Sequence, residues 1–230
     1  MYVSVGWEDR VDATHQPAGL AECPHGTRYK VGESPLSEGW WALPALLALG
    51  YLSGSWLAAL WVCRLAGMDD PRRAGSGNPG FSNVLRLHGK RLALITLVLD
   101  AAKGVPAVWL SVMLGLPPWA QGMVGLAVML GHSYPCWYRY RGGKAVASGF
   151  GVLLLLTPVV ALACAAIWLL LAWRVRTAAV ASLVSAAAAP LVSLWLAPEY
   201  LLVIIAFAAL VLLRHLLNIL RLRRGEEPQL

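Results

Sequence analysis

Residues 145–173 read AVASGFGVLLLLTPVVALACAAIWLLLAW, an apolar run that is interrupted once, by the pair Thr157-Pro158. Proline breaks or kinks a helix interior, so the run is either one bent helix or two short helices joined by a turn. One helix would give the chain six membrane crossings, and two would give it seven. This stretch therefore decides the topology of the whole chain.

The distribution of positive charge favours seven crossings. With seven, the basic first loop, the Arg139–Lys144 loop, the pair Arg174 and Arg176, and the basic tail all lie on one side, as the positive-inside rule requires. With six, the tail would lie opposite the first loop. Seven crossings require the helix from Gly143 to Leu156 to be shorter than the roughly 20 residues of a full span, which a thinned or tilted interface accommodates.

Composition indicates an integral membrane protein, because 58% of the 230 residues are hydrophobic and 13% are charged, with a mean hydropathy of +0.61. The length suits a bundle of short spans without an added soluble catalytic domain. We therefore predict an all-α integral membrane protein, a compact bundle of about seven transmembrane helices, some of them short. The other predicted spans are Trp40–Cys63, Leu92–Leu114, Trp119–Leu130 with its flanks, Ala178–Leu196 and Tyr200–Leu213.

Residues 1–39 form a polar extension of the membrane domain, residues 40–230. The extension has scattered charges and prolines and no apolar run, so we predict that it is disordered and is neither a signal peptide nor a span. The net charge of +7 is explained by basic loops beside the spans, which argues against a nucleic-acid partner. The cysteines occur singly, and Cys23 with His25 supplies only two ligands, so we predict neither a metal site nor a disulfide framework.

Three polar clusters stand between the apolar segments. The first is the loop of residues 75–86, GSGNPGFSNVLR, whose backbone N–H groups, small polar side chains and forked arginine suit a phosphate group. The alternative is a turn-forming connector, the usual role of an isolated glycine-rich loop. The candidate binding residues in this cluster are Ser76, Gly77, Asn78, Asn83 and Arg86.

The second cluster begins near His132 and ends with Gly142, Gly143 and Lys144. Two glycines that open a helix, followed by a lysine, predict unpaired N–H groups and a cation at a helix N-terminus, which together favour an anion. The run is not a Walker A motif, because Tyr138 stands where the first glycine should be. We therefore predict an anion site that does not belong to a nucleotide-binding loop.

The third cluster begins at Arg214 and includes His215 and Asn218, which share one face if the segment is helical. Seven crossings place all three clusters on the same side of the membrane, so we predict that they form one site. Within a span, Asp100 and Lys103 lie three residues apart and can pair. Charges in a span are costly, so the pair serves either function or helix packing.

In order and spacing, the three clusters resemble the motifs of the bacterial acyl-phosphate:glycerol-3-phosphate acyltransferases, the PlsY family. They read Gly75-Ser-Gly-Asn with Asn83-x-x-Arg86, Gly131-His-x-Tyr-Pro with Gly142-Gly-Lys144, and Arg214-His-x-x-Asn-Ile-x-Arg-Leu-x-x-Gly-x-Glu227. The run Asp100-x-x-Lys103-Gly104 is also similar to a family feature. The resemblance begins near residue 42, and the chain departs from the family pattern at Phe81, Ala145 and Ala179.

The resemblance implies an enzyme without metal or cofactor that moves a fatty acyl group from acyl phosphate to the sn-1 hydroxyl of glycerol 3-phosphate. The products would be lysophosphatidic acid and phosphate. By position, the family pattern implies Ser76, Arg86 and Lys144 at phosphate groups and His215 with Asn218 near the glycerol hydroxyl. Ser182 joins the candidate binding residues because it follows Arg176 in a family-like stretch. The proton acceptor is left open between His215 and the leaving phosphate.

The resemblance also implies a location in the cell (inner) membrane, surrounded by membrane lipid, with the motif loops and the C-terminus in the cytoplasm. A soluble enzyme that produces acyl phosphate is then an expected partner. The alternative function is a small transporter of phosphate or organic anions, because short spans broken by glycine and proline also suit transport. A transporter predicts anion sites reachable from both sides, whereas the motifs here gather on one.

Overall fold

The computed structural model describes residues 20–22, 28–30 and 40–230. The predicted disordered extension, residues 1–39, lies outside the described residues except for two short strands. These are β1, Leu20–Glu22, and β2, Arg28–Lys30, which pair antiparallel with Ala21 opposite Tyr29. The rest of the described chain is helical, which confirms the predicted fold class.

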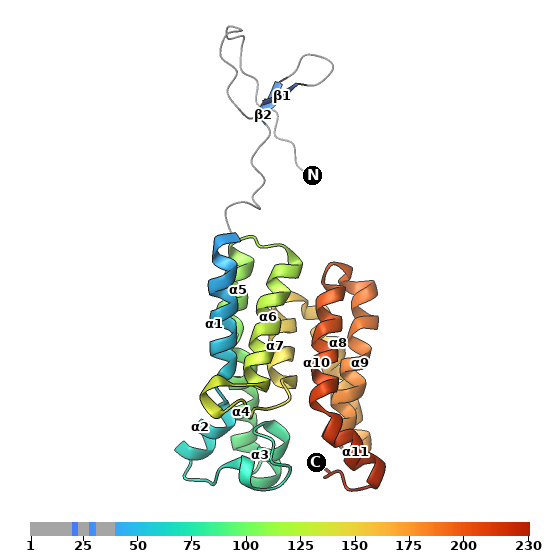
Figure 1. Ribbon diagram of the computed structural model, residues 1–230. Helices are drawn as coiled ribbons and strands as arrows, with labels where there is room; N and C mark the ends of the chain where they lie inside the picture. Colours follow the sequence, from blue (N-terminus) through green and yellow to red (C-terminus); the bar gives the residue numbers. More distant parts are fainter. Residues whose placement is uncertain (1–19, 23–27, 31–39) are drawn as a thin grey trace.

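The helices of the membrane domain fall into long bundle helices and short helices near the loops (Figure 1). The α-helices are α1 (Leu43–Ser55), α2 (Ala58–Leu65), α3 (Phe81–His88), α4 (Lys90–Ala102), α5 (Val105–Met113), α6 (Pro118–Ser133), α7 (Val146–Leu156), α8 (Pro158–Val175), α9 (Ala178–Leu196), α10 (Leu201–Arg214) and α11 (Leu216–Arg224). Short 3-10 helices cover Trp40–Ala42, Pro71–Arg73, Cys136–Tyr138 and Pro198–Tyr200. In Figure 1, α2, α3 and α11 gather at the same end of the bundle as the C-terminus.

All seven apolar segments predicted as spans are helical. Four helical stretches are long and apolar enough to cross a membrane by themselves: Trp40–Leu65, Lys90–Met113, Pro158–Val175 and Ala178–Leu196. A fifth candidate combines Pro198–Arg214 with α11 across a bend of 51°. The remaining two segments are α6 and the short α7.

The turn at Thr157 separates α7 from α8, as the charge distribution predicted. Thr157 has an extended φ of −143°, and its N–H donates to the carbonyl of Leu153 at 2.7 Å, which closes the last turn of α7. Pro158 then occupies the first position of α8, where a missing N–H leaves no hydrogen bond unmade. The local cause of the break is therefore the Thr-Pro pair itself.

Two spans are broken where the sequence predicted continuous helices. The first span is interrupted at Trp56 and Leu57, between α1 and α2, and the second at Lys103 and Gly104, between α4 and α5. The Lys103 ammonium, at the second break, donates to the carbonyl of Trp56, at the first break, at 2.9 Å. The two breaks are therefore joined by a hydrogen bond. A Cβ on Gly104 would press against Val128 of α6, which explains the small residue.

Small residues allow α1 and α6 to approach closely. A Cβ on Gly54 would overlap the carbonyl of Val128, and one on Gly131 of α6 would overlap the carbonyl of Tyr51. The outward faces of the bundle are apolar, and Trp195 and Leu202 are 84% and 81% exposed. Such surface is stable only in a lipid environment.

Candidate functional site

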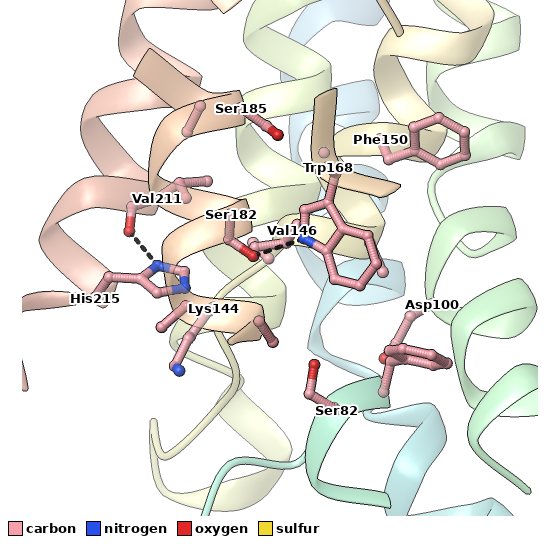
Figure 2. Close-up of a pocket in the computed structure, with 18 of the residues that line it drawn as sticks. Ser82, Asp100, Lys144, Val146, Phe150, Trp168, Ser182, Ser185, Val211 and His215 are labelled. Atoms are coloured by element: carbon pink, nitrogen blue, oxygen red, sulfur yellow. Dashed lines mark hydrogen bonds between the residues drawn. The ribbon is translucent and has the colours of Figure 1, made fainter. Parts of the chain in front are cut away.

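A cavity of about 410 Å³ lies among α3, α4, α6, α7, α8, α9 and α10. Most of its wall is apolar, including Met129, Phe150, Trp168 and Phe207. Figure 2 shows Lys144, His215 and Ser82 toward one end of this cavity and Phe150 toward the other. The predicted site residues that line it are Ser76, Asn78, Asn83, Arg86, His132, Lys144, Ser182 and His215. The structure therefore brings all three motifs to one cavity.

Four predicted site residues do not line the cavity, and each has a local structural contact instead. Gly77 adopts a φ of +72° in the first loop, which favours glycine. Gly142 and Gly143 give their carbonyls to Arg214, and Asn218 binds Glu227. These four residues shape the loops around the cavity.

Asn83 organises the first loop from inside. Its side chain is fully buried, and its amide Nδ2 donates to the carbonyls of Pro71 and Ala74 at 2.7 and 3.1 Å. Its Oδ1 accepts the N–H of Ser76 at 2.9 Å, and a Cβ on Gly75 would overlap that oxygen. The Asn83 side chain therefore fixes Ser76 at the cavity wall. It also leaves no room for a side chain at position 75, where the chain has glycine.

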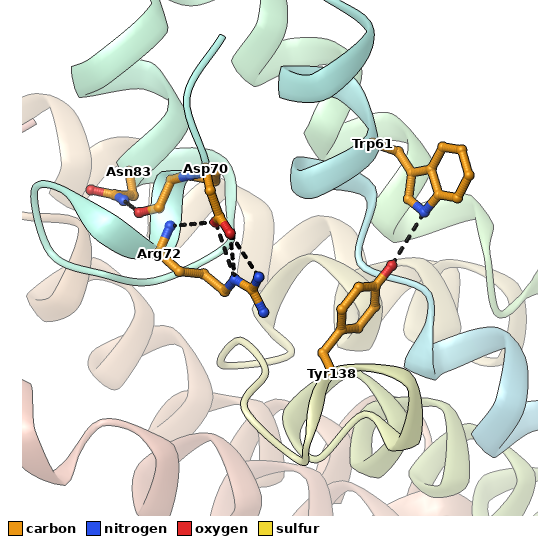
Figure 3. A network of polar contacts seen from close by, with 6 residues as sticks. Trp61, Asp70, Arg72, Asn83 and Tyr138 are labelled. Carbon is orange, nitrogen blue, oxygen red and sulfur yellow. Dashed lines mark hydrogen bonds and ion pairs between the residues drawn. The ribbon is translucent and has the colours of Figure 1, made fainter.

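A second network joins the first loop to the second (Figure 3). Asp70 caps the 3-10 helix Pro71–Arg73 by accepting the N–H of Arg72 at 2.9 Å, and it also pairs with that guanidinium at 2.7 Å. The guanidinium lies 5.7 Å from the ring centroid of Tyr138, whose hydroxyl accepts the indole N–H of Trp61 at 3.2 Å. These contacts hold the two motif loops at a fixed separation.

The C-terminal tail, residues 226–230, covers Arg86. The Arg86 guanidinium donates from Nε to the carbonyl of Gln229 at 2.6 Å and from Nη2 to the carbonyl of Pro228 at 3.2 Å. The tail is fixed at its end because the N–H of Leu230 donates to the carbonyl of Arg176 at 2.7 Å. The forked face of Arg86 is thus already engaged by two backbone oxygens.

The second loop is held differently from the way the sequence predicted. The N–H of Gly143 is not free for an anion, because it donates to the carbonyl of His132 at 3.0 Å. Helix α7 begins only at Val146, after Ala145 in a left-handed conformation with φ +59°, so the two glycines precede the helix and do not open it. Arg214 fastens the same loop through the Gly142 and Gly143 carbonyls at 3.1 and 3.0 Å.

Lys144 and His215 are the titratable groups at the polar end. Burial lowers the pKa of the Lys144 ammonium to about 8, with Glu227 opposing and Arg221, Arg86 and Arg214 adding to the decrease. Burial, followed by the charge of Lys144, lowers the pKa of His215 to about 4, so His215 is neutral near pH 7.

The tautomer of neutral His215 follows from its contact with the backbone. Nδ1 lies 2.8 Å from the carbonyl of Val211 at the end of α10. A carbonyl only accepts, so Nδ1 carries the proton and Nε2 is left as an acceptor. Figure 2 shows this contact and the imidazole beside Lys144.

Glu227 ends the third motif but was not among the predicted site residues. The structure places it in the cavity wall, where Oε1 accepts the amide of Asn218 at 2.6 Å. Its Oε2 is buried without a hydrogen-bond partner among the described residues. Trp168 was also missed, and its indole N–H donates to the Ser182 hydroxyl at 3.0 Å. The motif spacing was the only signal for Glu227, and no sequence signal pointed to Trp168.

Three charged or titratable side chains meet inside the bundle next to the cavity. The Lys103 ammonium lies 2.9 Å from Asp100 Oδ1 and 2.6 Å from Nδ1 of His132, and the side chains of Asp100 and Lys103 are each 2% exposed. The predicted pairing of Asp100 with Lys103 is therefore confirmed. Asp100 and His132 also line the cavity, so the cluster is continuous with the candidate site.

A helical membrane bundle whose cavity joins cationic side chains to a long apolar wall defines a class: membrane proteins that handle an anionic group together with an aliphatic chain. Comparison with known proteins identifies the member of that class. The glycerol-3-phosphate acyltransferase family pattern matches residues 44–225, and the chain belongs to this family.

Relatives cover most of the chain. It is 62% identical over 188 residues to a glycerol-3-phosphate acyltransferase of Chromohalobacter salexigens, which covers 82% of this chain and 92% of that protein. A protein of the same name from Neisseria gonorrhoeae is 46% identical over 194 residues, covering 82% and 96%.

Two crystal structures of PlsY (YgiH), an integral membrane glycerol 3-phosphate acyltransferase, share the fold. The glycerol 3-phosphate form superposes with a TM-score of 0.77 at 33% identity and covers 82% of this chain and 96% of that chain. The lysophosphatidic acid form superposes with a TM-score of 0.75 at 33% identity and covers 82% and 95%. The predicted family resemblance is confirmed, and the chain is a membrane enzyme of the glycerol-3-phosphate acyltransferase family.

Proposed function

We propose that this enzyme transfers a fatty acyl group from acyl phosphate to the sn-1 hydroxyl of glycerol 3-phosphate, forming lysophosphatidic acid and phosphate. The observation that carries the proposal is a single cavity with Arg86, Lys144 and His215 at its polar end and an apolar wall beyond them. Such a cavity suits two phosphate groups together with an aliphatic chain. The PlsY relative, crystallised in glycerol 3-phosphate and lysophosphatidic acid forms, supports the acceptor and the product.

The reaction needs positioning and charge more than a covalent nucleophile. The sn-1 hydroxyl oxygen attacks the acyl carbon, the bond from that carbon to the bridging phosphate oxygen breaks, and phosphate leaves with the electron pair. Acyl phosphate is a mixed anhydride with a good leaving group, so correct placement supplies much of the rate. Arg86 and Lys144 would offset the repulsion between the two anionic substrates, with Ser76 donating to a phosphate oxygen.

The hydroxyl proton has two possible acceptors, His215 Nε2 and the leaving phosphate. Nε2 of neutral His215 has an available lone pair, because Nδ1 carries the proton toward Val211. Asn218 does not line the cavity and holds the carboxylate of Glu227 instead. We therefore place His215 at the reacting hydroxyl and make Asn218 a positioning residue that acts through Glu227.

The remaining site residues would form the walls of the phosphate and acyl sites. Asn78 lies on the cavity wall beside Ser76, and Ser182 lies where the polar end meets Trp168. We propose the cell (inner) membrane as the location, with the motif loops and the tail in the cytoplasm, where a soluble enzyme can supply acyl phosphate. The gathering of positive loops at one end supports this orientation.

The direct test uses purified protein in proteoliposomes with radiolabelled glycerol 3-phosphate. Lysophosphatidic acid should form with acyl phosphate and should not form with acyl-CoA or acyl-carrier protein, because a bare phosphate fits the polar end. Comparable turnover with acyl-CoA would contradict the proposed donor while leaving the acceptor intact. Vectorial uptake of phosphate without acyl transfer would favour the transporter instead.

A further inference from the structure

The buried cluster of Asp100, Lys103 and His132 determines which nitrogen of His132 carries a proton. A protonated lysine has three N–H donors and no acceptor. The Lys103 ammonium has three partners: the Trp56 carbonyl at 2.9 Å, Asp100 Oδ1 at 2.9 Å and His132 Nδ1 at 2.6 Å. Each donor has one acceptor, so Nδ1 of His132 accepts and the imidazole proton of the neutral ring is on Nε2.

Charge balance supports the same assignment. Asp100 and Lys103 form a net neutral pair in a nearly dry part of the bundle, and an unpaired charge there would be strongly destabilising. If His132 donated from Nδ1 to an uncharged lysine, the Asp100 carboxylate would lose its cation. Nδ1 is 3.6 Å from Asp100 Oδ1, beyond hydrogen-bonding distance, so it could not replace that partner.

The other nitrogen of His132 faces the second loop. A Cβ on Gly143 would overlap Nε2, so the imidazole edge lies directly against the residue that precedes Lys144. His132 is 3% exposed and lines the cavity. Within the part of the chain that the structure describes, Nε2 has no protein hydrogen-bond partner, although the opposite nitrogen is firmly held. A neutral donor thus lies against the backbone of the glycine that precedes Lys144, and no hydrogen bond among the described residues uses it.

We propose that His132 is a neutral hydrogen-bond donor to a substrate phosphate through Nε2–H, and that Asp100 and Lys103 are positioning residues that fix this tautomer. The proposal relies on the proposed function only for the identity of the phosphate, which belongs to glycerol 3-phosphate or to the acyl donor. It also gives the intramembrane ion pair a role in binding. A neutral donor in the wall of the cavity that Lys144 also lines adds a hydrogen bond without adding a further charge to a buried site.

The first experiment measures the tautomer without any substrate. Nitrogen NMR of full-length protein labelled with ¹⁵N-histidine, with His132 assigned by its loss in His132→Gln, separates protonated from unprotonated ring nitrogens. We expect Nε2 protonated and Nδ1 unprotonated near pH 7. A protonated Nδ1 would overturn the proposal. Inorganic phosphate, then glycerol 3-phosphate, should shift the Nε2 signal, and no shift with either would overturn the binding role.

Kinetics then separates a donor from a packing role. The Gln amide nitrogen reaches the position of Nε2, whereas the Asn amide reaches only that of Nδ1. We expect His132→Asn to raise one KM about 10- to 100-fold, as for a lost hydrogen bond to a charged group, and His132→Gln to stay within a few fold of wild type. The substrate whose KM rises identifies the phosphate. His88→Gln, at the end of α3 and outside the cavity, is the matched control, and equal KM values for His132→Asn and wild type would refute the donor.

The double variant Asp100→Asn/Lys103→Met tests the positioning residues without leaving a single buried charge. We expect a mixed or reversed His132 tautomer and the same KM increase as in His132→Asn. An unchanged His132 tautomer together with wild-type KM values would show that Asp100 and Lys103 do not position His132. If the double variant does not fold, the NMR measurement on the intact protein still decides the tautomer. An enzyme that uses a donor other than acyl phosphate would leave the tautomer and the glycerol 3-phosphate result unaffected.

Discussion

Arg86 and Lys144 are both cations in the cavity wall, but their surroundings differ. Arg86 presents its planar fork to two carbonyl oxygens of the tail, whereas Lys144 has a compact ammonium whose pKa burial lowers to about 8. A guanidinium binds a phosphate by two parallel hydrogen bonds, and an ammonium acts more as a point charge. The two residues should therefore respond differently to substitution.

We expect Arg86→Lys to lose nearly as much activity as Arg86→Ala, because a lysine cannot reproduce the fork. Loss of a charge-assisted contact in a partly dry site corresponds to about 2–4 kcal/mol, or about 30- to 1000-fold in kcat/KM. Steady-state assays of both variants in proteoliposomes measure this. Arg91→Ala, an exposed residue of α4 outside the cavity, is the control. A nearly active Arg86→Lys would rule out a two-point contact.

Lys144 should give the enzyme a basic limb in its pH profile. The charged ammonium is the form that binds phosphate, so kcat/KM should fall as the pH rises through about 8. Stability should respond in the opposite sense: above pH 8 the folded protein has lost the proton that the unfolded chain keeps to about 10.4, so the Lys144 contribution to stability rises over that interval. Lys144→Arg should keep partial activity and lose this basic limb, because a guanidinium stays charged. If kcat/KM of Lys144→Arg still fell above about pH 8, the decrease would come from the titration of another group.

At the scale of the elements, glycines allow the backbones of neighbouring helices to come into contact. Gly54 lets α1 lie against the backbone of α6 at Val128, and Gly151 of α7 approaches Ala101 of α4 in the same way. A Cβ at either glycine would meet a backbone atom and not the end of a flexible side chain. An added Cβ would therefore push the two backbones apart.

We therefore expect Gly54→Ala to destabilise the protein by about 1–3 kcal/mol, as overpacking of a close contact does. Thermal unfolding in detergent micelles, followed by fluorescence, measures the change. Leu52→Ala, two residues away on the exposed side of α1, should have a much smaller effect. An equal decrease in Tm for both variants would mean that the α1 and α6 contact does not govern stability.

Local patterns and charge predicted several elements but missed the tertiary features. The Thr-Pro pair and the basic loops were enough to divide α7 from α8, and the resulting seven-crossing topology predicted one site that contains Ser76, Lys144 and His215. The breaks beside Trp56 and Gly104 depend on a hydrogen bond between residues 47 positions apart and on contact with α6. The packing of the tail on Arg86 depends on residues 142 and 143 positions apart, which no sequence period encodes.

At the scale of the whole molecule, the proposed orientation can be tested by labelling single cysteines in intact cells, in a background without native cysteines. We expect Arg73→Cys and Glu226→Cys to be protected from an impermeant reagent, because their loops lie at the proposed cytoplasmic end. Leu114→Cys, in the loop between α5 and α6 at the opposite end, should be labelled. Labelling of Arg73→Cys or Glu226→Cys without prior permeabilisation would reverse the topology.

The family match begins at residue 44, and the cavity wall is drawn wholly from residues beyond it. Deleting residues 1–38 should therefore leave kcat and both KM values within about two-fold of wild type, because no binding residue is removed. Activity of the truncated protein in proteoliposomes, at matched protein content, tests this. Complete loss in a well-inserted truncation would give the extension a role in catalysis.

The carbonyls of Pro228 and Gln229 that occupy Arg86 also bear on turnover. A phosphate that binds this guanidinium must therefore displace the two tail carbonyls. When phosphate dissociates, the two tail carbonyls can form their hydrogen bonds to the Arg86 guanidinium again, even before the product has fully left. Competition from within the chain weakens product binding as well as substrate binding, and it offers a way for an enzyme with strong cationic contacts to avoid being trapped by its own phosphate.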